Sequence, residues 1–143
     1  MLQKVAANQG AVNWFMREVE NMKVLKHPNV VRLKEFGYAD ETFFFTREYC
    51  DAGSVVDLMA KRGVSTLPIG EAVVIILQVL DGLTYTHNAE IPNVRWADGS
   101  FAKGRGLIHR DLKPGNIFLR MWVGNKLQKL RIMGYQKLLT KRF

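Results

Sequence analysis

The first regular pattern of apolar residues along the chain is helical. In residues 11–26 (AVNWFMREVENMKVLK), apolar side chains such as Phe15, Val19 and Met22 recur at intervals of three and four residues. This spacing predicts a helix. Pro28, in the HPN triplet that follows, predicts its end, because proline disfavours helical geometry in the residue before it.

Aromatic and β-branched segments follow, and they predict a hairpin and then a short helix. Residues 30–38 (VVRLKEFGY) and 42–50 (TFFFTREYC) are typical of two strands joined by an Ala-Asp-Glu turn. The sequence DAGS then interrupts the strand pattern. Asp51 or Ser54 can cap a helix over 55–62, which Gly63 closes.

The longest helix is predicted over residues 68–89, with Pro68 in its first turn. Residues 73–77 are apolar on every side. A short strand can show the same run, but the length of the segment favours a buried helix. Its most apolar run is too short to span a bilayer and is interrupted by Gln78 and Asp81. We therefore expect no membrane span and a soluble, cytoplasmic protein.

The second half of the chain predicts short strands around turns. Asp98-Gly99 is a hairpin signal, because these residue types accept positive φ angles. The expected strands are residues 94–97, 100–103, 107–111, 116–120 and 126–135. The alternation of helices and antiparallel strands in 143 residues predicts a single α+β domain.

Composition and charge narrow the class of protein. Apolar residues make up 48% of the chain, enough for a core, and the single cysteine excludes an internal disulfide. The net charge of +8 arises after Asp111, where 32 residues carry 8 basic and no acidic side chains. Up to and including Asp111, 21 − 8 = 13 basic residues balance 13 acidic ones. No aromatic residues alternate with these charges, which favours a solvated tail over nucleic-acid binding.

The residues best suited to catalysis lie in the segment HRDLKPGN, residues 109–116. A carboxylate (Asp111), an ammonium group (Lys113) and an amide (Asn116) lie within six residues, and the proline and glycine between them exclude a helix. Groups of these types can act on a phosphoryl group. The plainer interpretation is a turn cap at Asp111 and a solvated lysine.

This segment resembles the catalytic loop of eukaryotic-type protein kinases, because it matches H-R-D-L-x-x-x-N at every fixed position. The lysine after HRDL resembles the serine/threonine branch, and KPGN resembles bacterial members. Upstream, REVENMKVLKHPNVVRL resembles the family's helix C and next strand, and EYCDAGSVVDLM its hinge and helix D. The resemblance covers residues 12–119 of a partial kinase domain spanning 1–143, with a basic divergent tail over 120–143.

The resemblance implies an incomplete protein-kinase-like fold: helix C, part of the N-lobe sheet, the hinge, helices D and E, and the catalytic loop. It also implies roles for the loop residues. Asp111 would accept or orient the proton of a protein serine or threonine hydroxyl, Lys113 would neutralise charge on the γ-phosphate, and Asn116 would hold Mg²⁺. His109 would pack beneath the loop, and Arg110 would pair with a phosphorylated segment.

ATP and Mg²⁺ are the cofactors that the resemblance implies. Glu18, nine residues before His27, corresponds to the glutamate of helix C, and the backbone near Glu48 and Cys50 to the adenine contacts. A solvated helix face is the competing interpretation of Glu18. Cys50 is equally explained as a small core residue.

The chain also departs from the family pattern. It shows no Gly-rich loop and little of the helical C-lobe, and the ATP-pairing lysine is not assigned to Lys4, which is not in an apolar strand. Gly134 stands where the metal-binding aspartate is expected, with Tyr135 in the aromatic position. Between His87 and His109 lie 21 residues, predicted to form a hairpin that contacts a substrate or regulator, or is an inert surface ornament.

Three hypotheses follow. The first is a serine/threonine protein kinase homologue that transfers the γ-phosphoryl group of ATP to a protein, with weak or no activity in this chain alone. The second is a non-catalytic, pseudokinase-like binding module. The third is a nucleic-acid-binding protein using residues 113–142, which the charge pattern does not favour. In each case the apolar helix at 68–89 predicts self-association through uncovered surface.

Overall fold

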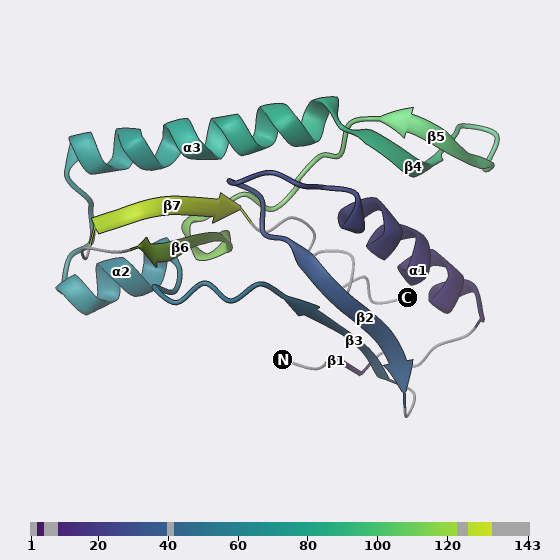
Figure 1. Cartoon of the computed structure of the whole chain (residues 1–143), viewed down its shortest axis with the longest axis horizontal. Helices are drawn as coiled ribbons and strands as arrows, with labels where there is room; N and C mark the ends of the chain where they lie inside the picture. Colours follow the sequence, from purple (N-terminus) through teal and green to yellow (C-terminus); the bar gives the residue numbers. More distant parts are fainter. Residues whose placement is uncertain (1–2, 5–8, 40–41, 123–125, 133–143) are drawn as a thin grey trace.

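The computed structural model describes residues 3–4, 9–39, 42–122 and 126–132, and the α+β class expected from the sequence is confirmed. Gly134 and Tyr135 lie outside the described residues. The helices and strands (Figure 1) are β1 (Gln3–Lys4), α1 (Gln9–Lys23), β2 (Leu33–Ala39), β3 (Thr42–Arg47), α2 (Val55–Arg62), α3 (Ile69–Asn88), β4 (Glu90–Arg95), β5 (Phe101–Arg105), η1 (Pro114–Asn116), β6 (Ile117–Trp122) and β7 (Lys126–Ile132).

An antiparallel sheet with strand order β1-β3-β2 packs against α1. Phe15 and Val19 of α1 are buried together with Leu33 of β2, as the helical spacing of the apolar residues predicted. The strand β1 was not predicted. It pairs with the start of β3, with Gln3 opposite Phe43 and Lys4 opposite Thr42.

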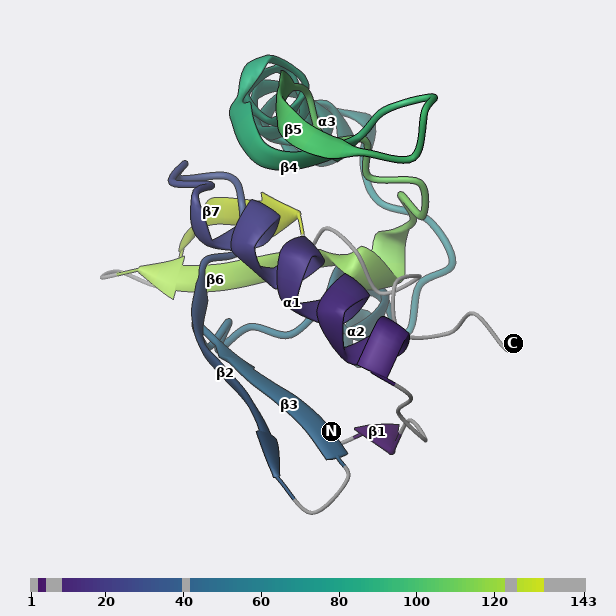
Figure 2. The ribbon, with the colours of Figure 1, turned by 90° about the vertical axis from the view of Figure 1, so that its right-hand side faces the viewer.

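A second core joins the rest of the molecule. Its buried residues come from the segment after α1 and from α2, α3, β4 and β6: Leu25, Val30, Val55, Ile75, Val79, Ile91, Ile117 and Leu119. Figure 2 shows α3 and the β4–β5 hairpin on one side of β6 and β7, with the β2–β3 sheet on the other. Ile117 directly follows the HRDLKPGN loop, so the end of the loop is anchored in this second core.

The helix ends follow local sequence signals closely in one case and less so in another. Ser54, one of the two expected caps, accepts a hydrogen bond from the backbone N–H of Asp57 (3.2 Å), and the Asp57 carboxylate accepts from the Ser54 N–H (2.7 Å). Gly63 closes α2 at φ 65°. α1 ends at Lys23 rather than residue 26, because the chain turns there to bury Leu25.

The strand expected at residues 107–111 is wrong, since the structure has no regular element there. The Gly106 N–H donates to the carbonyl oxygen of Ala89 (2.9 Å), and the Leu107 N–H donates to that of Thr86 (2.9 Å), at the end of α3. These bonds do not belong to a sheet. Arg110 then adopts φ 62°, a left-handed conformation incompatible with a strand. The chain therefore enters the loop as an irregular segment tied to α3.

The apolar run at residues 73–77 predicted that α3 would be buried on every side. The structure shows that one side of α3 is exposed. Ile75 and Val79 face the core, whereas Val74 is 54% exposed and Leu77 60% exposed. By length and composition alone, the described part of the chain contains one helix that could cross a bilayer, α3, with a mean hydropathy of 1.4. One apolar stripe of this helix therefore lies outside the core.

Candidate active site

The HRDLKPGN loop is held at both ends by packed structure. Its first residues follow the contacts with α3, and its last three form the short 3₁₀ helix η1, which begins with Pro114 and ends at Asn116. β6 begins at the next residue, and Ile117 and Leu119 anchor it in the core. Pro114 fixes the φ angle at the start of η1, which restricts the conformations that the loop can adopt.

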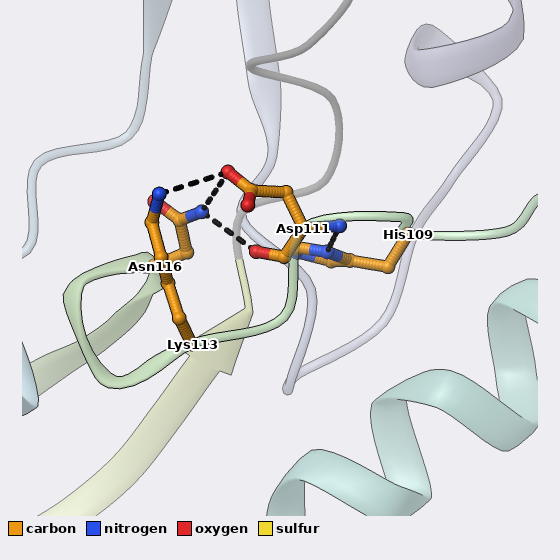
Figure 3. A network of polar contacts seen from close by, with 4 residues as sticks. All are labelled: His109, Asp111, Lys113 and Asn116. Carbon is orange, nitrogen blue, oxygen red and sulfur yellow. Dashed lines mark hydrogen bonds and ion pairs between the residues drawn. The ribbon is translucent and has the colours of Figure 1, made fainter.

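The three polar side chains singled out by the sequence converge, as Figure 3 shows. The Asn116 Nδ2 group donates to the Asp111 carbonyl oxygen (2.8 Å) and to its Oδ2 (3.0 Å). The Lys113 Nζ lies 3.1 Å from the same Oδ2. Asn116 is only 3% exposed, so its amide is fixed in orientation and restrains the Asp111 carboxylate.

His109 lies beneath this cluster and is buried. The backbone N–H of Asp111 donates to the His109 carbonyl oxygen (2.9 Å) and to its ring Nδ1 (3.3 Å). The side chain of Arg110, between them, is exposed, and its left-handed backbone turns the chain sharply. The buried His109 ring and the left-handed Arg110 together determine the direction in which the Asp111 side chain points.

Glu18 lies in the middle of α1 and is partly buried. Loss of solvent raises the pKa of its carboxyl group above the ordinary 4.5, and the nearby positive charge of Arg110 lowers it in part. The structure thus brings Glu18 within electrostatic reach of the HRDLKPGN loop. The sequence placed both residues at a kinase site but did not predict that they would influence each other.

Replacing Glu18 with glutamine is expected to stabilise the fold at neutral pH and to have little effect under acidic conditions. A carboxyl group with a raised pKa in the folded state stabilises below its unfolded pKa of about 4.5, and that contribution is lost as the pH rises through the folded value. Urea unfolding of both proteins across this pH range measures the difference. A difference that stays constant with pH would contradict the assignment.

The segment expected to contact adenine leads from β3 to residues that are paired with β6. The backbone N–H of Glu48 donates to the carbonyl oxygen of Arg32 (3.0 Å). In return, the Glu48 carboxylate accepts from the backbone N–H of Arg32 (2.7 Å). Beyond Cys50, the Ala52 N–H donates to Leu119 (3.2 Å). Burial raises the pKa of the Cys50 thiol, with Arg47 opposing the shift, so the thiol is not activated. Glu48 thus holds a strand end, and hydrogen bonding links the hinge-like segment to the loop through β6.

One feature of the site was not predicted from the sequence. The Arg47 guanidinium lies over the Phe118 ring, 4.5 Å from its centroid, and so joins the end of β3 to β6. The available signal was the position of Phe118, two residues after Asn116.

The oxygen atoms of this loop fit a magnesium ion better than a softer metal. The Asn116 side chain carries an amide oxygen besides the Nδ2 group that donates to Asp111, and Mg²⁺ prefers oxygen ligands, with phosphate and water completing its coordination. Within the described residues, no group of three or more histidine, cysteine, aspartate or glutamate side chains could hold a metal by itself. The arrangement therefore suits an ion that arrives with a phosphate ligand.

Comparison with known proteins places these observations in a family. The protein kinase domain family matches residues 1–135. Serine/threonine-protein kinase GIN4 of Saccharomyces cerevisiae is 33% identical over 72% of this chain, and serine/threonine-protein kinase PknI of Mycobacterium bovis is 30% identical over 73%. The chain spans only 7% and 15% of those two proteins.

Solved structures agree with the sequence relatives. The PknI kinase domain of Mycobacterium tuberculosis matches with a TM-score of 0.64 at 27% identity, over 91% of this chain and 44% of that one. A mutant of the same domain matches with a TM-score of 0.66 at 25% identity, over 95% and 45%. The chain thus spans somewhat less than half of a solved kinase domain.

Proposed function

This chain belongs to the protein kinase family, and from that premise we propose that it binds Mg²⁺–ATP and acts on the γ-phosphoryl group through the HRDLKPGN loop. The acceptor is a serine or threonine hydroxyl of a protein, as the names of the relatives suggest for this chain. The observation that carries the proposal is the convergence of Lys113 and Asn116 on the Asp111 carboxylate. Phosphoryl transfer by a kinase depends mainly on positioning the reactants and stabilising charge, and little on covalent catalysis by the protein.

Each loop residue has a distinct proposed role. Asp111 orients the substrate hydroxyl and receives its proton, while the Asn116 amide keeps the carboxylate in place. Lys113 turns from Asp111 toward the incoming phosphate and neutralises the charge that develops there. Bound Mg²⁺–ATP supplies the transferable group. His109 and Arg110 support the backbone, and Arg110 offers a guanidinium to a phosphorylated segment.

We extend the proposal to the base of the nucleotide. The backbone of the segment from Glu48 to Cys50 would pair with adenine, because this segment leads directly to Ala52, whose N–H donates to Leu119 of the strand that follows Asn116. Arg47 and Phe118 flank this position. A base entering here would meet a guanidinium already stacked on the ring.

The metal site is proposed to be weaker than in a complete kinase. Asn116 is one ligand, while Gly134 provides no carboxylate where the family pattern has an aspartate. Loss of that ligand lowers Mg²⁺ affinity and slows transfer, so the chain alone has weak or no activity. The same observation favours the second candidate function, a pseudokinase-like module that binds nucleotide or a protein without catalysis.

Thermal unfolding with and without Mg²⁺–ATP tests the proposal. A ligand that binds only the folded state stabilises it by about 2.7 kcal/mol at 100 times its Kd, which gives a measurable rise in the midpoint. Mg²⁺ alone and ATP with chelator are the controls. A rise with Mg²⁺–ATP alone supports a kinase-type site, and phosphate transfer to a mixed serine and threonine substrate then separates kinase from pseudokinase. No shift at saturating nucleotide would refute nucleotide binding.

We further propose that the chain is cytosolic and associates with itself through the exposed stripe of α3. Val74 and Leu77 lie three residues apart on one helix face and are both more than half exposed. The double variant Val74→Glu/Leu77→Glu is expected to shift an oligomer to a monomer in light scattering. Thr84→Glu, at an exposed polar position of α3, is the matched control. A wild-type chain that stays monomeric at all concentrations would contradict this.

A further inference from the structure

The β4–β5 hairpin, residues 90–105, packs on α1 rather than extending into solvent. It lies between α3 and the HRDLKPGN loop in the sequence, and its strands flank the Asp98-Gly99 turn, with Gly99 at φ 84°. Figure 2 shows it above α1, and the contacts below confirm that the two are neighbours. These residues are therefore neither an ornament nor, on this face, a free surface.

The centre of this contact is a reciprocal pair of hydrogen bonds. The Asn21 Nδ2 donates to the main-chain carbonyl of Asn93 (2.9 Å), and the Asn93 main-chain N–H donates to Asn21 Oδ1 (3.0 Å). The side-chain amide of Asn21 thus pairs with the strand as another strand would. Asn21 is 3% exposed, so both bonds are shielded from water and their loss would leave buried polar atoms unsatisfied.

Two further contacts flank the pair. The Asn93 side chain donates from Nδ2 to Glu20 Oε2 (2.8 Å), and the Arg17 guanidinium lies 4.2 Å from the centroid of the Phe101 ring. Arg17, Glu20 and Asn21 are spaced i, i+3, i+4 and so lie on one face of α1. β4 contributes Asn93 and β5 contributes Phe101. Contacts with both strands restrict sliding of α1 along its axis and rotation about it.

The hairpin is also fixed at its root. Ile91 is 1% exposed in the core beneath α3, and Gly106 donates to Ala89 (2.9 Å). Gly106 has φ 89°, and a Cβ atom there would lie 2.8 Å from the His87 carbonyl oxygen, so only glycine fits. Three residues later the chain reaches His109. The same rigid root therefore connects α3, the hairpin and the loop.

We propose that the β4–β5 hairpin is an intramolecular clamp that sets the position of α1, and with it Glu18, relative to the HRDLKPGN loop. Asn21 and Asn93 are its positioning residues. The docking itself is independent of the proposed function. Its effect on nucleotide binding rests on that function, because a displaced α1 would carry Glu18 away from the charged loop.

Hydrogen exchange on the full chain tests the clamp directly. Asn21→Ala removes both main-chain pairings and is expected to speed exchange of the α1 amides about tenfold or more, with α3 unchanged. Asn93→Ala keeps those pairings and removes only the bond to Glu20, so a smaller effect is expected. Asn88→Ala, whose amide bonds within α3 to Thr84, is the matched control and should leave α1 unchanged.

Two outcomes would overturn the clamp: unchanged α1 exchange in a folded Asn21→Ala, or an equal rise in α1 and α3, which would show general destabilisation. If Asn21→Ala does not fold, Phe101→Leu removes the ring under Arg17 and gives the same test with a smaller expected change. Mg²⁺–ATP affinity is measured in parallel. A localised rise in exchange without any nucleotide binding by the wild type keeps the clamp and refutes only the proposed function.

Discussion

Asparagine in place of Asp111 is expected to lower the rate of phosphoryl transfer by at least about 100-fold, the usual contribution of a positioned proton acceptor. The amide has nearly the shape of the carboxylate and can still accept the hydrogen bond from Asn116. It cannot take a proton from a hydroxyl or pair with Lys113. Because the loop keeps its shape, the variant should bind Mg²⁺–ATP about as well as the wild type.

Single-turnover transfer with the protein in excess over labelled ATP measures this even where the rate is low. Asp81→Asn, at an exposed carboxylate of α3, is the control and should retain the wild-type rate. If Asp111→Asn transfers phosphate at the wild-type rate, Asp111 is not the acceptor. If neither protein transfers phosphate although both bind nucleotide, the pseudokinase-like alternative holds.

Ile91→Ala should lower the free energy of unfolding by about 2–4 kcal/mol, because the change removes three buried carbon atoms and leaves a cavity. Ile91 is 1% exposed and packs in the same core as Val79 of α3, also 1% exposed. The site lies under the hairpin root, where hydrogen-bonded backbone prevents the chain from closing the gap. A loss of this size would be a large part of the total stability of a small domain.

Urea unfolding of wild type and variants measures the loss, and Ile91→Val provides the matched control. Valine removes one carbon atom and is expected to cost about 0.5–1.5 kcal/mol. The two variants should share the wild-type m-value if only packing has changed. An alanine variant no less stable than the valine variant would show that the hairpin root is not part of the core.

Local signals predicted the parts of the fold that local interactions determine. α2 begins and ends where its cap and glycine indicated, and α3 extends over the apolar segment with Pro68 as its N-cap residue instead of within its first turn. The strand predicted at 107–111 was wrong, because the Leu107 N–H donates to Thr86 and Arg110 adopts a left-handed φ of 62°. β1 was missed, since two residues carry no periodicity and form a strand only beside β3.

The candidate site divides in the same way. Asp111, Lys113 and Asn116 lie within one short loop, so their sequence spacing was enough to predict that they meet. The influence of Arg110 on Glu18 joins residues 92 positions apart (110 − 18 = 92), and no sequence pattern indicates it. The role of the hairpin was likewise open in the sequence, because the choice between ornament and contact depends on the facing helix.

The Gly106–Ala89 hydrogen bond also bears on how such a hairpin can be gained or lost during evolution. Because the two ends of the hairpin lie side by side (2.9 Å from N to O), removing the residues between them leaves α3 and the loop the same short step apart. The entropy of closing a loop changes slowly with its length, so insertions at this point cost little. A lineage could thus acquire or discard this hairpin as a unit without rebuilding the loop that follows it, although a loss would also require changes around Ile91 and Asn21.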